Sequence, residues 1–94
     1  MHKLEGHFAT PNGSKYLQQL CKHFGHKIDV AFTENEGTAT FAFGAAKLTS
    51  DESGLTIRFE LEDADKLPAA KGVIDSHLER FAFREDFKNM DWSV

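Results

Sequence analysis

Most of the side chains that could do chemistry lie in two short stretches of this sequence. Cys21–Lys27 contains a thiol, two imidazoles and two amines, and His77–Glu85 contains an imidazole, two guanidinium groups and two carboxylates. Neutral imidazoles bind transition metals, and guanidinium groups bind carboxylates and phosphates in a forked geometry. Each stretch ends a segment with helical periodicity. If the two helices run roughly parallel across one sheet face, we expect the stretches to meet; antiparallel helices would separate them.

The first stretch raises the possibility of a metal site. In a helix, Cys21 and His23 point about 200° apart and cannot share an ion while the helix persists. His23 and His26 can face one ion if Gly25 ends the helix, and His77 is then the third ligand. A closed structural zinc site needs four ligands. The alternative is that these histidines are solvated groups beside the terminal carbonyls of a helix.

The second stretch indicates anion binding as well. His77 falls on the inward stripe of its helix, so it is either a core histidine with a satisfied partner or a group that lines a pocket. Arg80 and Arg84 lie one turn apart and can hold a carboxylate or phosphate between them. The alternative is that both arginines simply favour a helix C-terminus and pair with Glu79 and Glu85.

Composition restricts the classes of protein. A chain of 94 residues with 40% hydrophobic residues and nine phenylalanines predicts one folded domain with a bulky core. A net charge of −4 argues against a nucleic-acid surface. The densest apolar run, Phe41–Ala46, is far shorter than the roughly 20 residues that span a bilayer, so we expect no embedding in a membrane. The lone Cys21 and the absence of an apolar leader in Met1–Pro11 predict a cytoplasmic protein.

Enzyme signatures are sparse. The sequence has no nucleophile elbow, no phosphate-binding glycine loop, no dinucleotide fingerprint and no zinc-protease motif. Cys21 lies on an apolar helical stripe with no activating cation beside it, which favours a core residue over a nucleophile. A catalytic role would therefore have to rest on His77, the only reasonable acid or base, and a non-catalytic protein is the favoured interpretation.

Periodicity predicts the order of the elements. A first strand, Leu4–Phe8, ends in a turn at Thr10–Gly13, and Ser14 can cap a helix that Gly25 ends. Four alternating segments follow, and the last helix starts near Asp65, with an interior Gly72 that would let it approach the sheet closely. The four alternating segments are Ile28–Phe32, Ala39–Phe43, Ala46–Leu48 and Leu55–Leu61.

These elements predict an α+β fold with a five-stranded antiparallel sheet and two helices on one face. The order strand, helix, four strands, helix matches the class called TATA-binding-protein-like, by topology only. Thr56, Arg58 and Glu60 point to water, as expected for a sheet with one wet face. The packed face is predicted to carry Phe32, Phe41, Phe43, Ile57 and Phe59.

The two stretches also carry a family resemblance. Tyr16–Phe24 with His26-Lys27, Gly44, and His77–Glu85 followed by Trp92 resemble the bacterial family known as domain of unknown function 2218. The resemblance implies a small bacterial cytoplasmic domain that occurs alone or joined to a flavin-dependent siderophore-interacting reductase, and hence a link to iron handling. The family's motif positions correspond here to His23, His26, His77, Arg80, Arg84 and Glu85.

The sequence therefore predicts a non-catalytic module that binds a small anion or a metal. The ligand-binding residues are expected to be His23, His26, His77, Arg80 and Arg84, with His23, His26 and His77 as the metal ligands. Two alternatives stay open: an interaction domain that acts beside a siderophore-interacting reductase, and a small enzyme that uses His77. Because an open sheet has two edges and the core is small, we also expect a homodimer. No cofactor is indicated.

Overall fold

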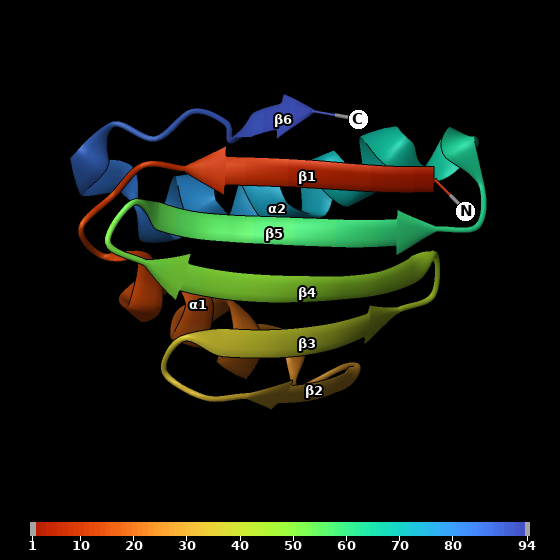
Figure 1. Ribbon diagram of the computed structural model, residues 1–94, viewed down its shortest axis with the longest axis horizontal. Helices are drawn as coiled ribbons and strands as arrows, with labels where there is room; N and C mark the ends of the chain where they lie inside the picture. The colour runs from red at the N-terminus through yellow and green to blue at the C-terminus, as the bar shows by residue number, and fades with distance from the viewer. Residues whose placement is uncertain (1, 94) are drawn as a thin grey trace.

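The computed structural model describes residues 2–93 and has an antiparallel sheet with two helices behind it (Figure 1). The strand order is β2-β3-β4-β5-β1-β6, so the sheet has six strands. The bounds are β1 His2–Phe8, α1 Gly13–Phe24, β2 Asp29–Phe32, β3 Glu36–Phe41, β4 Gly44–Asp51, β5 Gly54–Leu61, α2 Leu67–Phe81 and β6 Asp91–Ser93, with short 3-10 turns η1 Ala64–Lys66 and η2 Phe83–Glu85.

The α+β class, the two helices and the antiparallel sheet are confirmed, but the predicted five strands are wrong. The additional strand β6 pairs with β1, and Gly6 lies opposite Trp92. Asp75 of α2 holds β6 in place, because its carboxylate accepts hydrogen bonds from the backbone N–H of Met90 and the indole N–H of Trp92. A Cβ atom at Gly6 would lie 2.7 Å from the Trp92 ring, so only glycine leaves room for this indole. The likeness to TATA-binding-protein-like folds stays a prediction from element order.

Both helices pack on the same sheet face (Figure 1). Ile57 and Phe59 of β5 are fully buried there, as predicted, and Phe41 and Phe43 pack at the border of the core. Phe32 has the predicted parity, since it lies opposite the buried Gly37, but 38% of its surface is exposed. The reason is its place at the end of β2, the outermost strand, which has a neighbouring strand on one side only.

The helix ends differ in detail from the prediction. Helix α1 begins at Gly13, so Ser14 lies inside the helix and its hydroxyl donates to the carbonyl of Glu34 instead of capping. Gly25 follows the last helical residue, as predicted. The expected role of Gly72 is wrong, because a Cβ atom there would meet no described atom within 4 Å. Neither helix within residues 2–93 has the length and apolarity needed to cross a bilayer.

One glycine in the sheet is required by the backbone. Gly44 begins β4 with φ of 150°, a conformation that side chains rarely allow, and an added Cβ would lie 2.2 Å from the Glu60 carbonyl oxygen. Gly44 therefore marks the tight turn between β3 and β4, where Phe41 and Phe43 stack with ring centroids 5.1 Å apart.

Candidate functional site

The two chemistry-bearing stretches meet in the folded chain, although α1 and α2 run antiparallel, the orientation that was predicted to separate them. The ring centroids of His23, in the last turn of α1, and His77, in α2, lie 4.6 Å apart. Phe24 packs edge-on against His77 at 5.1 Å, and Phe81 packs edge-on against His23 at 6.2 Å. The pair is therefore held by aromatic side chains of both helices, and sequence positions more than fifty residues apart share one site.

A backbone contact determines which nitrogen of His77 is free. Its Nδ1 atom lies 2.5 Å from the carbonyl oxygen of Val73, one turn earlier in α2. A carbonyl oxygen can only accept, so Nδ1 must carry the proton in this contact. The neutral ring then has a lone pair on Nε2, and the protonated ring has a second N–H donor there. His77 can accordingly present Nε2 to a ligand in either state.

A hollow of about 240 Å³ adjoins the histidine pair. Most of its lining is apolar, and its polar groups are two imidazoles and one amine. This composition fits a ligand with an apolar body and one polar end. The lining residues are His23, Phe24, Lys27, Ile28, Phe41, Val73 and His77.

The electrostatics of the hollow favour negative charge. The pKa of His23 is lowered, first by desolvation and then by repulsion from His77, Lys27, His26 and Arg80. All four of these neighbours are cations or can become cations. In a chain with a net charge of −4, this is a local concentration of positive charge. A bound anion would relieve the repulsion among these groups.

The predicted site residues divide into three groups. His23 and His77 line the hollow, His23 as an exposed residue and His77 as a half-buried one. His26 and Arg80 are exposed outside the lining and act on the pKa of His23. Arg84 lies away from the hollow lining, with its guanidinium over the exposed ring of Phe83 at 5.6 Å from the centroid. The clustering is therefore tightest for the two histidines that face each other across the helices.

A three-histidine metal centre does not form. Within residues 2–93, no three His, Cys, Asp or Glu side chains gather as a group that could hold a metal ion. His23 and His77 are close, but His26 lies past the end of α1 and outside the lining of the hollow. Cys21 is fully buried in the core, and burial raises the pKa of its thiol to about 11, so it is a packing residue as the sequence indicated.

Glu85 forms a polar cluster that the sequence did not reveal. Its carboxylate accepts hydrogen bonds from the hydroxyls of Thr10 and Tyr16 and from the side-chain amide of Asn12. Desolvation alone would raise the pKa of Glu85, but these three donors outweigh it and hold the pKa below its ordinary value. Burial, followed by the bond to Glu85, raises the pKa of Tyr16 to about 12.

This Glu85 cluster ties the start of α1 to the segment after α2. The donors and the acceptor are about seventy residues apart in the chain, so no local pattern could have linked them. The only signal was that Tyr16 and Glu85 both belong to the stretches that carry the family resemblance. Because every one of these groups has a partner, the cluster is a structural clasp rather than a binding site.

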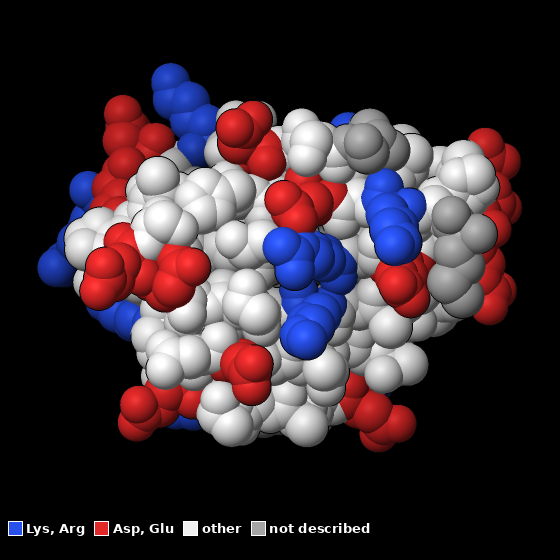
Figure 2. Space-filling model, in the orientation of Figure 1, with Lys and Arg blue, Asp and Glu red and all other residues white. Residues whose placement is uncertain are grey.

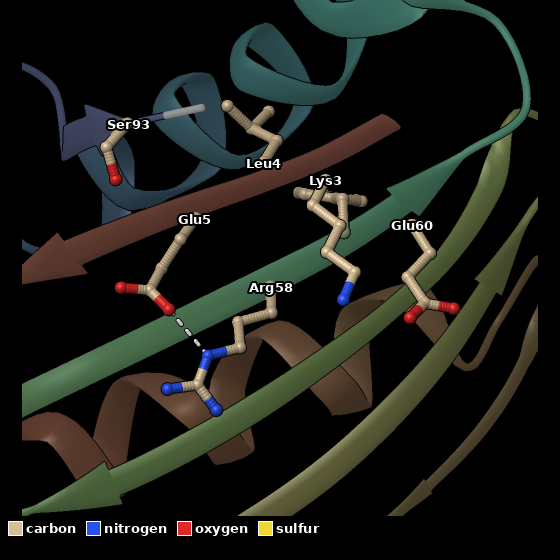
Figure 3. A pocket seen from close by; sticks show the side chains of 7 residues that line it. Lys3, Leu4, Glu5, Arg58, Glu60 and Ser93 are labelled. Carbon is tan, nitrogen blue, oxygen red and sulfur yellow. Dashed lines mark hydrogen bonds and ion pairs between the residues drawn. The ribbon is translucent and has the colours of Figure 1, made fainter. Parts of the chain in front are cut away.

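A larger hollow, of about 490 Å³, lies on the uncovered sheet face (Figure 3). The Nε atom of Arg58 donates to the Glu5 carboxylate at 2.5 Å, and both side chains are largely exposed. Figure 2 shows basic side chains near the centre of this face with acidic ones beside them. Exposed pairs of this kind are well hydrated and contribute little to ligand binding. We therefore place the candidate site at His23 and His77.

The protein has an α+β fold with both helices on one face of the sheet, and a pair of imidazoles lies where the two helices meet. Residues 5–93 match the family model described as "Uncharacterized protein conserved in bacteria (DUF2218)", and the chain belongs to this family, as its motifs predicted. A solved relative is the NMR structure of PA4090 from Pseudomonas aeruginosa, with 28% sequence identity and a TM-score of 0.80 over 99% of this chain and 96% of that chain. No curated protein matches the sequence.

Proposed function

We propose that this protein binds a small organic anion, a ring-bearing carboxylate, in the hollow beside His23 and His77. The observation that supports the proposal is the contact between the two imidazoles at 4.6 Å, at the rim of an apolar hollow. Phe24 and Phe41 pack edge to face, with ring centroids 5.1 Å apart, and offer an aromatic wall for the body of the ligand. Lys27 and the two imidazoles offer donors for its carboxylate.

The size of the hollow limits the ligand. A volume of about 240 Å³ is below the roughly 300–1,000 Å³ typical of sites for drug-sized molecules. A single ring with one carboxylate fits this scale, and a ligand of that size binds with a Kd on the order of 0.1–1 mM. The protein in this proposal acts by holding the ligand, since the imidazoles and the amine serve as hydrogen-bond donors and no described Ser, Thr or Cys side chain lines the hollow.

An anion suits the site better than a bare metal ion. Two neutral imidazoles are fewer ligands than a tightly held transition metal takes from a protein. The other polar neighbours, Lys27, His26 and Arg80, repel a cation whenever they are protonated. The observation that favours the anion is therefore the sign of the surrounding charge.

The link to iron handling and the siderophore-interacting reductase partner stay predictions from the family resemblance, as does the cytoplasmic location. They suggest one specific extension of the ligand class. A ring-bearing carboxylate that can also chelate iron would present negative charge and an aromatic edge to the same groups, and its ferric complex would show whether the bound metal is tolerated. Such a complex belongs in the ligand panel beside the free acid.

The test is a titration of tag-free protein, because a histidine tag would add competing imidazoles. Benzoate and salicylate are added with two-dimensional amide NMR as the readout, followed by Zn²⁺ alone and ferric salicylate. We expect saturable shifts at His23, Phe24, Ile28 and His77 with the acids. Absence of saturation at about 10 mM acid would overturn the proposal. Saturable shifts at the two histidines with Zn²⁺ alone, without any effect of the acids, would instead assign a metal.

A matched pair of lysine variants sharpens the result. Lys27 lines the hollow, whereas Lys22 is an exposed residue of α1 outside the lining. Lys27→Gln is expected to weaken benzoate binding about threefold to tenfold, and Lys22→Gln by less than about twofold. Equal losses in both variants would mean that binding follows net charge and not the hollow.

A further inference from the structure

The two edges of the sheet differ in whether another segment of the chain covers them. On one side, β6 covers the edge of β1 and is anchored to α2 through Asp75. On the other side, β2 is the last strand, and Asp29, Ala31 and Phe32 are all exposed. Exposed edge strands present unpaired N–H and C=O groups that can add a further strand. The β2 edge is therefore an interaction surface.

The hydrogen bonding of β2 identifies which backbone groups are free. The N–H of Thr33, just past β2, donates to the carbonyl of Glu36 at the start of β3, at 2.7 Å. In an antiparallel ladder, successive residues point their polar groups to opposite sides. Ala31 and Asp29 therefore bond to β3, whereas the N–H and C=O groups of Val30 and Phe32 point outward from the edge.

We infer that β2 pairs with β2 of a second copy of this chain, antiparallel, with the two-fold axis at Ala31. This register places Val30 opposite Phe32 of the second copy, and Phe32 opposite its Val30. Residues exchanging both hydrogen bonds in an antiparallel pair must both point their polar groups at the partner. The register therefore satisfies every outward group of Val30 and Phe32 in each copy.

The side chains of β2 support a second copy of this chain as the partner that pairs with the β2 edge. Opposite residues in this register have the same parity, so both copies keep their helices on the same side of one continuous sheet. The exposed ring of Phe32 then packs on Val30 of the second copy, extending the apolar face across the axis. Asp29 falls opposite Thr33 and Lys27 opposite Asn35, next to Glu34, so no like charges face each other.

A neighbouring register fits less well. With the axis at Val30, Phe32 would lie opposite Ile28. The N–H of Ile28 already donates to the carbonyl of Phe24 at 3.0 Å and is not free to pair across the edge. The Ala31 register is thus selected by the backbone groups that the fold leaves free, independently of the ligand proposed for the hollow.

A cysteine on the axis tests the register directly. In this pairing Ala31 faces itself as a non-hydrogen-bonded pair, with Cα atoms about 4.5 Å apart, within the range for a disulfide. Ala31→Cys is therefore expected to form a covalent dimer under mild oxidation. Asp29→Cys is the matched control on the same strand and face, and it faces Thr33 instead of itself. Equal or slower crosslinking of Ala31→Cys than of Asp29→Cys would overturn the inference.

Sedimentation equilibrium of the unmodified chain supplies the second test. We expect concentration-dependent dimerisation with a Kd on the order of 100 µM, because a single strand pair buries a small interface. Phe32→Lys brings two ammonium groups together across the axis and is expected to raise this Kd at least about tenfold. Phe83→Lys changes another exposed ring away from the edge and should leave it unchanged. A wild-type chain that is monomeric at about 1 mM, or a Phe32→Lys chain that still dimerises equally well, would refute the interface.

Discussion

The two ends of α1 contact the second motif stretch in opposite ways. Near its start, Tyr16 joins Thr10 and Asn12 around the Glu85 carboxylate, and the donors match the acceptor. At its end, His23 meets His77 among further cations. The first arrangement leaves no charge without a partner, and the second gathers charge of one sign. The comparison separates a cluster that holds the fold from one suited to hold something else.

The largest expected effect is on stability at the Glu85 clasp. Glu85→Ala removes the acceptor from the Tyr16 hydroxyl, whose residue is only 3% exposed, and leaves a buried donor without a partner. We expect the free energy of unfolding to fall by about 2–3 kcal/mol. Urea denaturation measures it, with Glu79→Ala, an exposed residue of α2, as a control that should change it by less than about 0.5 kcal/mol. Equal losses in the two variants would show that the clasp adds nothing.

Substitution in the histidine pair is expected to have a small effect on stability and a larger effect on ligand binding. His77→Ala should change the free energy of unfolding by no more than about 1 kcal/mol, since it deletes a half-buried ring. The same change should weaken benzoate binding at least about tenfold, a difference of about 1.4 kcal/mol. Calorimetry at fixed ionic strength measures it, with His26→Ala as the control outside the hollow. Unchanged affinity in His77→Ala would remove this histidine from the site.

The smallest effects are on pH dependence, and the two clusters should titrate in different ranges. The pKa of Glu85 is lowered by folding, so its contribution is complete above its ordinary value of about 4.3 and is lost as the pH falls through the lower folded value. The stability difference between wild type and Glu85→Gln should therefore be constant from about pH 5 to 8 and shrink below about pH 4.

His23 should respond at higher pH. Its pKa is also lowered by folding, so the folded chain disfavours the protonated ring, and stability declines as the pH falls below the ordinary value of about 6.5. Between about pH 7 and pH 5, wild type should lose slightly more stability than His23→Gln, and solvent screening of the exposed ring keeps the difference small. Urea midpoints at matched pH values compare the two. A wild type that gains stability over this range would reverse the sign of the assigned repulsion.

Alternation and periodicity predicted most of the fold. The parity of Ile57 and Phe59 identified the packed face because each strand is buried on one side only. Strand β6 escaped prediction because three residues with one apolar side chain, Trp92, show no periodicity. The cap at Ser14 was wrong because its hydroxyl found a partner in Glu34, which is distant in sequence. Local patterns therefore located the elements, while long-range contacts determined their ends.

The candidate site was predictable in part for a related reason. His23 and His77 stand out by residue type and by their places near helix ends, but a meeting of the two stretches was predicted only for parallel helices. The helices run antiparallel, because the start of α1 contacts Glu85 after α2 and the end of α1 contacts His77. The stretches still meet because His77 lies inside α2, about one turn before its end. That His77 bonds to Val73, and that Arg84 stacks over Phe83, depends on side-chain geometry that spacing does not encode. The Glu85 clasp could not be predicted, because the sequence does not show that the turn before α1 packs beside η2.

The place of β1 between β5 and β6 in the strand order has a consequence for the folding rate. Strands β2 to β5 follow one another in the chain and pair as consecutive hairpins, so their contacts are local. Strand β1 pairs only with β5 and β6, which lie far along the sequence, and closing such long loops is slow. We expect the hairpins to assemble first and β1 to enter between β5 and β6 late, so that in pulse-labelled refolding the amides of the earliest segment in the sequence are among the last to gain protection from exchange.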